Sequence, residues 1–192
     1  GGTDGIGKEI ARDLARGGAS VLIVGRDLAK GQRAQRELRD STGNLNVEFL
    51  PADLSLIRES YRLAKEAGRR CPALHYLVHS AGLVRGHREL TEEGVESNFA
   101  INYLRRFALT SCLLPLLESG GRPGSVARIL IISGALFRMV KKFKQIDPPA
   151  SVRDLRTDLR LWELSEQLVE ARPFALANEN PGRQPQSAGY PQ

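Results

Sequence analysis

The chain has 192 residues, the size of one domain, and its 41% hydrophobic and 26% charged residues are ordinary for a globular protein. The net charge of +6 favours an anionic ligand, but only 6% of the residues are aromatic and no dense basic cluster contains them, which argues against a nucleic-acid partner. No apolar stretch approaches the length of a membrane span, so we predict no membrane segment. The cysteines, Cys71 and Cys112, lack metal-ligand spacing and favour a reducing, cytoplasmic compartment.

Helices and strands alternate along most of the chain. Ile6, Ile10 and Leu14 recur every four residues and predict the apolar face of a first helix. The predicted helices cover 5–16, 27–40 and 56–68, and short apolar runs predict strands over 20–25, 47–52, 74–79 and 126–133. This alternation indicates a parallel sheet with right-handed crossovers. The predicted fold class is therefore α/β, with a doubly wound parallel sheet.

A longer helix is predicted after a loop rich in Gly, Arg and His. Thr91 has the hydroxyl group typical of an N-cap, and Glu92 and Glu93 would lie in the positively polarised first turn. We expect this helix to run to about Glu118. We also expect it to be bent or interrupted near Pro115, because proline removes a helix hydrogen bond.

Residues 1–7, Gly-Gly-Thr-Asp-Gly-Ile-Gly, form a glycine loop directly before the first helix. Glycines at positions 1, 5 and 7 permit a tight turn and let a pyrophosphate approach the helix N-terminus. A flexible, glycine-rich end before an ordinary helix is the alternative. Because no strand precedes the loop, we expect residues to be missing upstream. The loop and the alternating pattern together predict a Rossmann-type sheet, incomplete at the N-terminus and after residue 137.

Two further positions follow predicted strands at the edge where such a sheet binds its ligand. Arg26 can pair with the 2′-phosphate of NADP, whereas an acidic residue there, such as the neighbouring Asp27, would bind the ribose of NAD. A solvated arginine at a strand end is the alternative. The carboxylate of Asp53 can accept a hydrogen bond from an adenine amino group while Leu54 packs near the ring, although Asp53 is equally suited to capping a helix.

Together these segments resemble the short-chain dehydrogenase/reductase family, and within it the retinol-dehydrogenase-like branch. The resemblance covers residues 1–137. It rests on the glycine loop, Asp53-Leu54-Ser55, His79-Ser80-Ala81-Gly82, Asn102 within Ile-Asn-Tyr-Leu, and Ile131-Ile132-Ser133-Gly134.

The resemblance implies hydride transfer between NADP(H), with NAD as the alternative, and a small-molecule alcohol or carbonyl of retinoid, steroid or lipid-like character. It implies that the catalytic residues include Asn102 and Ser133. Asn102 also lies on one helical face with Val95 and Phe99, where an amide is either functional or a satisfied core group. The cofactor-binding residues that it implies are Gly1, Thr3, Gly5, Ile6, Gly7, Arg26, Asp53, Leu54, Ser80, Ala81 and Gly82.

The sequence departs from the family pattern on the catalytic side. The family usually has Ser-Ser, of which the second serine is catalytic, and an ungapped register places Ser133 at the first and Gly134 at the second. Either a one-residue shift makes Ser133 the catalytic hydroxyl, or that hydroxyl is absent. His79 and Ser80 replace the usual Asn-Asn, and Arg105 replaces a small residue.

The larger departure is the family's Tyr-x-x-x-Lys motif, which should follow the serine by about a dozen residues. Residues 141–150 contain no tyrosine. Tyr61 and Lys65 have the required spacing, but they precede the third predicted strand, so we interpret them as a coincidental surface pair. We expect little or no hydride transfer by this chain itself. His75, His79 and His87 lack helical metal-ligand spacing, and we predict no metal site.

Three segments follow from these patterns. Residues 1–137 are the predicted NAD(P)-binding domain, 138–172 a divergent and partly helical segment, and 173–192 a tail whose Pro, Gly, Gln and Asn content predicts disorder. The main hypothesis is an oxidoreductase. The alternatives are a catalytically incomplete nucleotide-binding fragment or isoform, and a basic interaction protein that uses 138–172. A homodimer remains open, since the family often pairs through its long helices.

Overall fold

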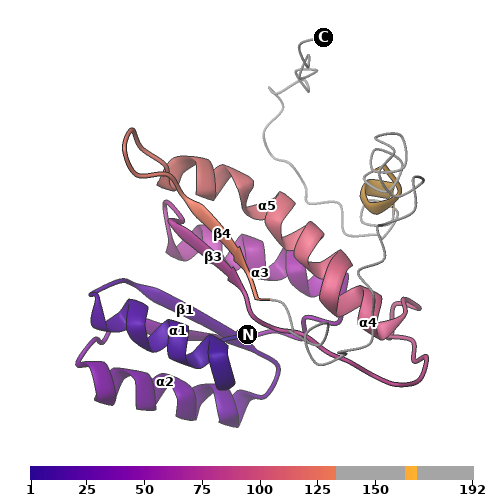
Figure 1. Cartoon of the computed structure of the whole chain (residues 1–192), viewed down its shortest axis with the longest axis horizontal. Helices are drawn as coiled ribbons and strands as arrows, with labels where there is room; N and C mark the ends of the chain where they lie inside the picture. The colour runs from indigo at the N-terminus through magenta and orange to yellow at the C-terminus, as the bar shows by residue number, and fades with distance from the viewer. Residues whose placement is uncertain (133–162, 168–192) are drawn as a thin grey trace, which may run out of the picture.

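The structure, a computed structural model, describes residues 1–132 and 163–167 (Figure 1). The elements of residues 1–132 are, in order, α1 (Gly5–Arg16), β1 (Val21–Gly25), α2 (Leu28–Thr42), β2 (Val47–Pro51), α3 (Ile57–Arg70), β3 (Tyr76–His79), α4 (Ser97–Phe99), the π-helix η1 (Ala100–Leu104), α5 (Arg105–Gly120) and β4 (Arg128–Ile131). The predicted α/β class is confirmed. The helices and strands predicted before residue 80 are confirmed as well, with shifts of a few residues at their ends.

Most of the segments predicted beyond residue 132 lie outside the described residues. This applies to Ser133, to the proposed boundary at residue 137 and to the tail over 173–192. Of the segment 138–172, only 163–167 are described, and these five residues are helical. The interaction-protein alternative therefore stays a prediction.

The strands form two parallel pairs. β1 pairs with β2 from Val21 opposite Val47 to Gly25 opposite Pro51. β3 pairs with β4 from Tyr76 opposite Arg128. Within the described residues the sheet is thus partial, and Figure 1 shows the N-terminus lying between the two pairs, with α1 and α2 beside the first and α3 and α5 beside the second.

The buried face of α1 differs from the predicted one. Asp4 caps the helix by accepting a hydrogen bond from Gly5 N, and the buried residues are Gly7, Ala11 and Ala15. Their small side chains let the helix pack closely on β1 and α2, around Ile23, Leu38 and Val47. The predicted face of Ile6, Ile10 and Leu14 is therefore not the one in the core, and Ile6 is 66% exposed.

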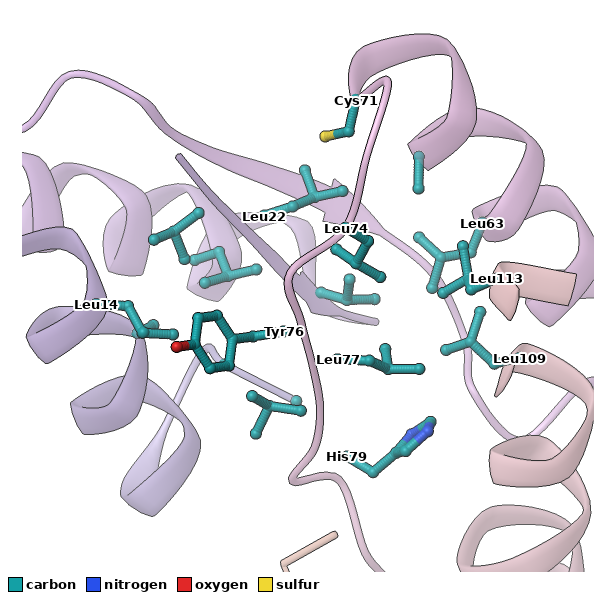
Figure 2. A pocket seen from close by; sticks show the side chains of 18 of the residues that line it. Leu14, Leu22, Leu63, Cys71, Leu74, Tyr76, Leu77, His79, Leu109 and Leu113 are labelled. Atoms are coloured by element: carbon teal, nitrogen blue, oxygen red, sulfur yellow. The ribbon is translucent and has the colours of Figure 1, made fainter. Parts of the chain in front are cut away.

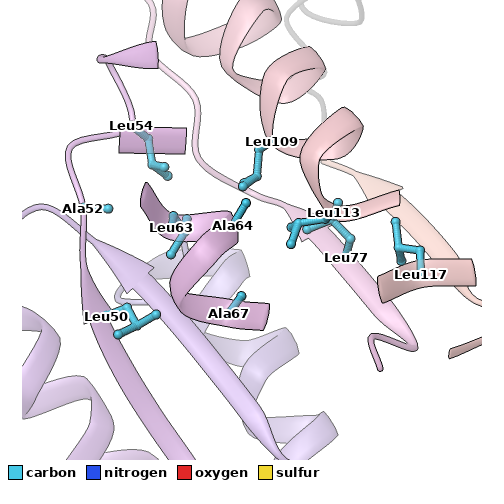
Figure 3. Close-up of a cluster of buried hydrophobic side chains, with 10 residues drawn as sticks. All are labelled: Leu50, Ala52, Leu54, Leu63, Ala64, Ala67, Leu77, Leu109, Leu113 and Leu117. Atoms are coloured by element: carbon cyan, nitrogen blue, oxygen red, sulfur yellow. The ribbon is translucent and has the colours of Figure 1, made fainter. Parts of the chain in front are cut away.

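A second core cluster joins the two halves of the chain (Figure 3). Leu50, at the end of β2, packs with Leu63 and Ala67 of α3. The same cluster continues through Leu77 of β3 to Leu113 of α5. α3 contributes residues to the same cluster as Leu50 of β2 and Leu77 of β3. It therefore packs between the β1–β2 pair and the β3–β4 pair and holds them together.

The long helix begins later than predicted, because a different residue supplies the cap. Glu96 accepts hydrogen bonds from Asn98 N and Phe99 N, and the helical region starts at Ser97. Thr91 instead closes a turn, where its carbonyl accepts from Gly94 N and its amide donates to Val95 O. The expectation that Thr91 is the N-cap is wrong. α5 continues through Pro115, so the helix is not interrupted there, and the alternative expectation of a bend stays a prediction.

Glu93 caps a helix far away in the sequence. Its carboxylate accepts from Ile57 N at 2.6 Å and from Arg58 N at 3.1 Å, at the first turn of α3. α3 has no side-chain cap of its own, because its N-cap position is Leu56. The negative charge of Glu93, which we expected in the first turn of the helix after Thr91, therefore stabilises the N-terminus of α3 instead.

We expect Glu93→Ala to lower the free energy of unfolding by about 1–2 kcal/mol, because two amides at the start of α3 lose a charged acceptor. Urea unfolding measures this change. Glu92→Ala is the matched control, since it removes the same charge from an exposed ion pair with Arg58 and should cost less than about 0.5 kcal/mol. Equal losses in the two variants would contradict the assignment of Glu93 as the cap of α3.

Candidate functional site

The glycine loop lies between the carboxyl ends of β1 and β3. The carbonyl of Gly1 accepts a hydrogen bond from Val24 N at 3.2 Å, and the loop then enters α1 through Gly5. Gly5 has φ +52°, a conformation that favours glycine, and a Cβ placed there would meet no atom within 4 Å. The start of α1 is therefore open to an approaching group, at the end of the helix that favours anions.

The other side of the loop packs tightly against the end of β3. A Cβ on Gly7 would come within 2.9 Å of the Ser80 Cβ, and a Cβ on Gly1 within 2.7 Å of Ala81 N. Only glycine permits this approach without displacing the backbone that follows β3. The loop and Ser80–Ala81, both of which the family resemblance implies as cofactor-binding, are thus brought together.

The end of β1 supplies a cation beside the loop. Arg26 is exposed and directly follows β1. The neighbouring Asp27 is the N-cap of α2 and accepts from Lys30 N at 2.8 Å. The Lys30 ammonium also lies 2.5 Å from Asp4 Oδ2, and this hydrogen bond, with the cap and the charge of Lys30, holds the pKa of Asp4 below its ordinary value. The edge of the loop therefore carries the Asp4 carboxylate, which is paired with Lys30, and the exposed guanidinium of Arg26.

The residues after β2 take a local turn. Asp53 Oδ1 accepts from Ser55 N at 2.9 Å and from Ser55 Oγ at 2.7 Å. This turn, and not a cap of α3, is what Asp53 stabilises. Leu54 belongs to the second core cluster and is 9% exposed. The predicted contacts of both residues with adenine stay predictions.

The loop after β3 is fixed by Asn102. The Oδ1 atom of Asn102 accepts from Leu83 N at 3.0 Å, and its Nδ2 donates to Leu83 O at 2.6 Å. Asn102 lies within the π-helix η1, a type of irregularity that is frequent at functional sites. Both halves of the amide are satisfied, so in this structure Asn102 positions the backbone that follows Gly82. The catalytic role that the family resemblance implies for Asn102 stays a prediction.

Arg105 is a site residue that the sequence did not predict. Its side chain is buried, with 1% exposure, and donates to Ile101 O and Ala81 O, both at 3.0 Å. Arg106 donates more weakly to the same carbonyl at 3.4 Å. Burial and the neighbouring Arg106 lower the pKa of Arg105 to about 10, so it stays charged at neutral pH. Consecutive arginines on a predicted helix are typical of a solvated face, and no pattern signalled this burial.

His79, at the end of β3, is also buried, with 1% exposure, and its Nε2 lies 2.9 Å from Thr110 Oγ1. Desolvation, followed by the charges of Arg105 and Arg106, lowers the pKa of His79 from 6.5 to about 4. The imidazole is therefore neutral at pH 7. Its hydrogen bond links β3 to α5.

Two of the tyrosines within the described residues have structural contacts. Tyr61 packs on the cluster that includes Ile57 and Leu104. Tyr103 stacks on Phe99 with ring centroids 5.2 Å apart, and its hydroxyl lies 3.1 Å from Ser165 Oγ. The rejection of Tyr61 and Lys65 as a catalytic pair stays an interpretation from sequence order.

Within residues 1–132 and 163–167, no group of three or more His, Cys, Asp or Glu side chains could hold a metal ion. Over the same residues, no helix is both long and apolar enough to cross a membrane.

The order of these elements and the glycine loop match a known family. The sequence profile of the short chain dehydrogenases matches residues 1–142. The chain belongs to the short-chain dehydrogenase family. Among solved structures, the Pseudomonas aeruginosa RhlG/NADP active-site complex superposes on this chain with a TM-score of 0.63 and 27% identity, covering 88% of this chain and 64% of that one.

Relatives of the short-chain dehydrogenase come from the predicted branch. Polyprenol dehydrogenase of Homo sapiens is 36% identical over 135 residues, which are 70% of this chain and 41% of that protein. Retinol dehydrogenase 12 of Mus musculus is 37% identical over 133 residues, 69% of this chain and 42% of that protein. The chain thus spans less than half the length of these curated relatives. The predicted family and its retinol-dehydrogenase-like branch are confirmed.

The buried histidine predicts a specific pH dependence. The unfolded chain takes up a proton on His79 near pH 6.5, whereas the folded chain does so only near pH 4. The stability that the neutral imidazole contributes is therefore complete above pH 6.5 and is lost as the pH falls toward 4, by up to about 3 kcal/mol. His79→Asn removes the titrating group.

Urea unfolding of the parent and of His79→Asn at pH 7, 6 and 5 measures this effect. We expect the variant to gain stability relative to the parent as the pH is lowered. Carboxylates that titrate in the same range cancel in the difference between the two proteins. Parallel stability profiles would contradict the depressed pKa of His79.

Proposed function

We propose that this chain carries the NADP(H)-binding part of an oxidoreductase that transfers hydride between the nicotinamide and an alcohol or carbonyl substrate. The observation that carries the proposal is the open start of α1 at Gly5, beside the ends of both β1 and β3. A helix N-terminus reached through glycine is suited to a pyrophosphate, because the first amides lack partners within the helix.

The predicted cofactor residues fit a dinucleotide laid across this edge. Gly1, Thr3, Gly5 and Gly7 would hold the pyrophosphate, with the exposed side chain of Ile6 beside it. Ser80, Ala81 and Gly82 would border the nicotinamide half, and Arg26, Asp53 and Leu54 the adenosine half. When bound, the cofactor supplies or accepts the hydride, and the residues of the chain hold and orient it.

Arg26 supports NADP over NAD. Because the Asp27 carboxylate is used as the cap of α2, the side chain at the end of β1 that is free to meet a ribose substituent is the guanidinium of Arg26. A guanidinium pairs with a 2′-phosphate through parallel hydrogen bonds. The NADP complex among the similar structures supports the same preference.

We propose that Asn102 contributes to catalysis by positioning the loop that follows β3. Its two hydrogen bonds to Leu83 hold the backbone that follows Ser80–Gly82, where a nicotinamide would lie. Ser133, the other proposed catalytic residue, follows β4 and lies outside the described residues.

A second candidate function is nucleotide binding without turnover. The chain has no tyrosine between Tyr103 and Tyr190, so none follows Ser133 at the family's spacing. Proton transfer to the substrate oxygen requires an acid with a suitable pKa, and in this family the tyrosine of the Tyr-x-x-x-Lys motif supplies it. This observation favours a chain that binds NADP(H) and reacts poorly.

For the substrate, we propose an apolar alcohol or its carbonyl counterpart. Two relatives are named for such alcohols, polyprenol and retinol. A homodimer stays a prediction, as does the cytoplasmic compartment.

Arg26→Ala should weaken NADPH binding at least about tenfold while changing NADH binding less than about twofold, because only NADPH carries the 2′-phosphate. Fluorescence titration measures both affinities. Arg36→Ala, on the exposed surface of α2, removes the same charge away from the end of β1 and is the matched control. Equal loss with both cofactors, or an equal loss in the control, would overturn the role of Arg26.

Purified 1–192 should bind NADPH and yet show little or no oxidation of NADPH with a panel of apolar aldehydes and ketones. Absorbance at the NADPH band, followed together with product analysis, measures turnover. Steady turnover would overturn the second candidate and support an enzyme that protonates its substrate through another group. Absence of NADPH binding would overturn both candidates.

A further inference from the structure

Two neighbouring arginines at the start of α5 lie behind the segment that follows β3. The Nη2 atoms of both donate to the carbonyl of Ala81, from Arg105 at 3.0 Å and from Arg106 at 3.4 Å. Arg106 Nη2 also lies 3.3 Å from the carbonyl of Ile132, directly after β4. Two like charges therefore converge on one backbone oxygen, near the carboxyl ends of β3 and β4.

No carboxylate balances these two charges within residues 1–132 and 163–167. The hydrogen bonds of both guanidinium groups go to backbone carbonyls, and the buried Nε of Arg106 has no acceptor. His79 is the titratable side chain beside them, and Figure 2 shows its imidazole directed toward α5. Because burial and the two arginines lower the pKa of His79 to about 4, it is neutral at pH 7. The positive charge at this place is thus uncompensated.

The segment after β3 is held so that its exposed side faces away from these arginines. Alternate residues bond through their backbone to side chains of α4, η1 and α5. The pairs are Ala81 with Arg105, Leu83 with Asn102, and Arg85 with Asn98. Between them, Gly82 and Val84 are exposed. A single layer of backbone therefore separates the buried guanidinium of Arg105 from the surface that Gly82 presents.

A buried charge acts on a ligand through this layer, because little water lies between them to screen it. The phosphates of the cofactor are the same in its two redox states. The nicotinamide ring is not the same, since it carries a positive charge in NADP⁺ and none in NADPH. A nearby positive charge in the protein raises the free energy of the first form and leaves that of the second almost unchanged.

We propose that Arg105 and Arg106 make this site select NADPH over NADP⁺, by placing uncompensated positive charge behind the backbone that borders the nicotinamide. The two residues determine specificity through their charge and need no contact with the ring. The inference rests on the proposed function, in which Ser80–Gly82 border the nicotinamide half of the cofactor.

Calorimetric titration of the full chain with NADPH and with NADP⁺, at one ionic strength, tests the proposal. The variants are Arg106→Gln and Arg105→Gln, which remove one charge each, and Arg106→Lys and Arg105→Lys, which keep it. Arg36→Gln removes an exposed charge on α2 and is the matched control. Phosphorylated ADP-ribose, which has the 2′-phosphate but lacks nicotinamide, reports on the adenosine half alone. Circular dichroism verifies that each variant is folded.

We expect the parent chain to bind NADPH at least about tenfold more tightly than NADP⁺. The ratio of the two affinities should fall at least about threefold in each glutamine variant, because one of the two charges is lost. It should stay within about twofold of the parent in the lysine variants and in Arg36→Gln. Affinity for phosphorylated ADP-ribose should change less than this ratio does. Arg106 is less buried than Arg105, so its variants carry the test if those of Arg105 do not fold.

Three results would overturn the proposal. A parent chain that binds both forms equally would show that the charges do not act on the ring. Equal weakening of both forms in the glutamine variants, with the ratio unchanged, would show that the arginines only hold the backbone after β3. Absence of binding of either form to the parent would overturn the proposed function, and the inference with it.

Discussion

The close approach of the glycine loop to the end of β3 is the constraint on which the proposed site depends. Gly7 lies so near Ser80 that any side chain there would collide with it, and Gly1 lies equally near Ala81. This contact fixes where α1 starts, and hence where its positively polarised end points. It also sets the loop between β1 and β3, so that residues from three separate segments meet at one edge. The backbone of the loop is thus as specific a part of the site as any side chain.

The alternation of elements and the site segments before residue 80 could be predicted because local signals carry them. Glycine spacing and apolar runs are properties of a few neighbouring residues. The start of the long helix could not be predicted in this way. Thr91 has the more typical N-cap side chain, but Glu96 caps the helix and the Glu93 carboxylate binds the first turn of α3 instead. The burial of Arg105 was also hidden, because its partners are backbone carbonyls that carry no sequence signal.

The orientation of α1 follows from its small residues. A helix with apolar residues on two faces is typical of a buried position between two layers, and here Ala11 and Ala15 meet β1 and α2, while Ile10 and Leu14 border an apolar cavity of about 590 Å³.

The most direct test of the central claim is the map of backbone amide chemical-shift changes when NADPH is added to the isotope-labelled chain. The account predicts changes concentrated in residues 1–7, at Arg26 and Asp53, and over 80–83, the segments that the structure brings to one edge. It predicts little change in the second half of α5. Changes spread over α5, or an absence of change in the glycine loop at saturating NADPH, would contradict it.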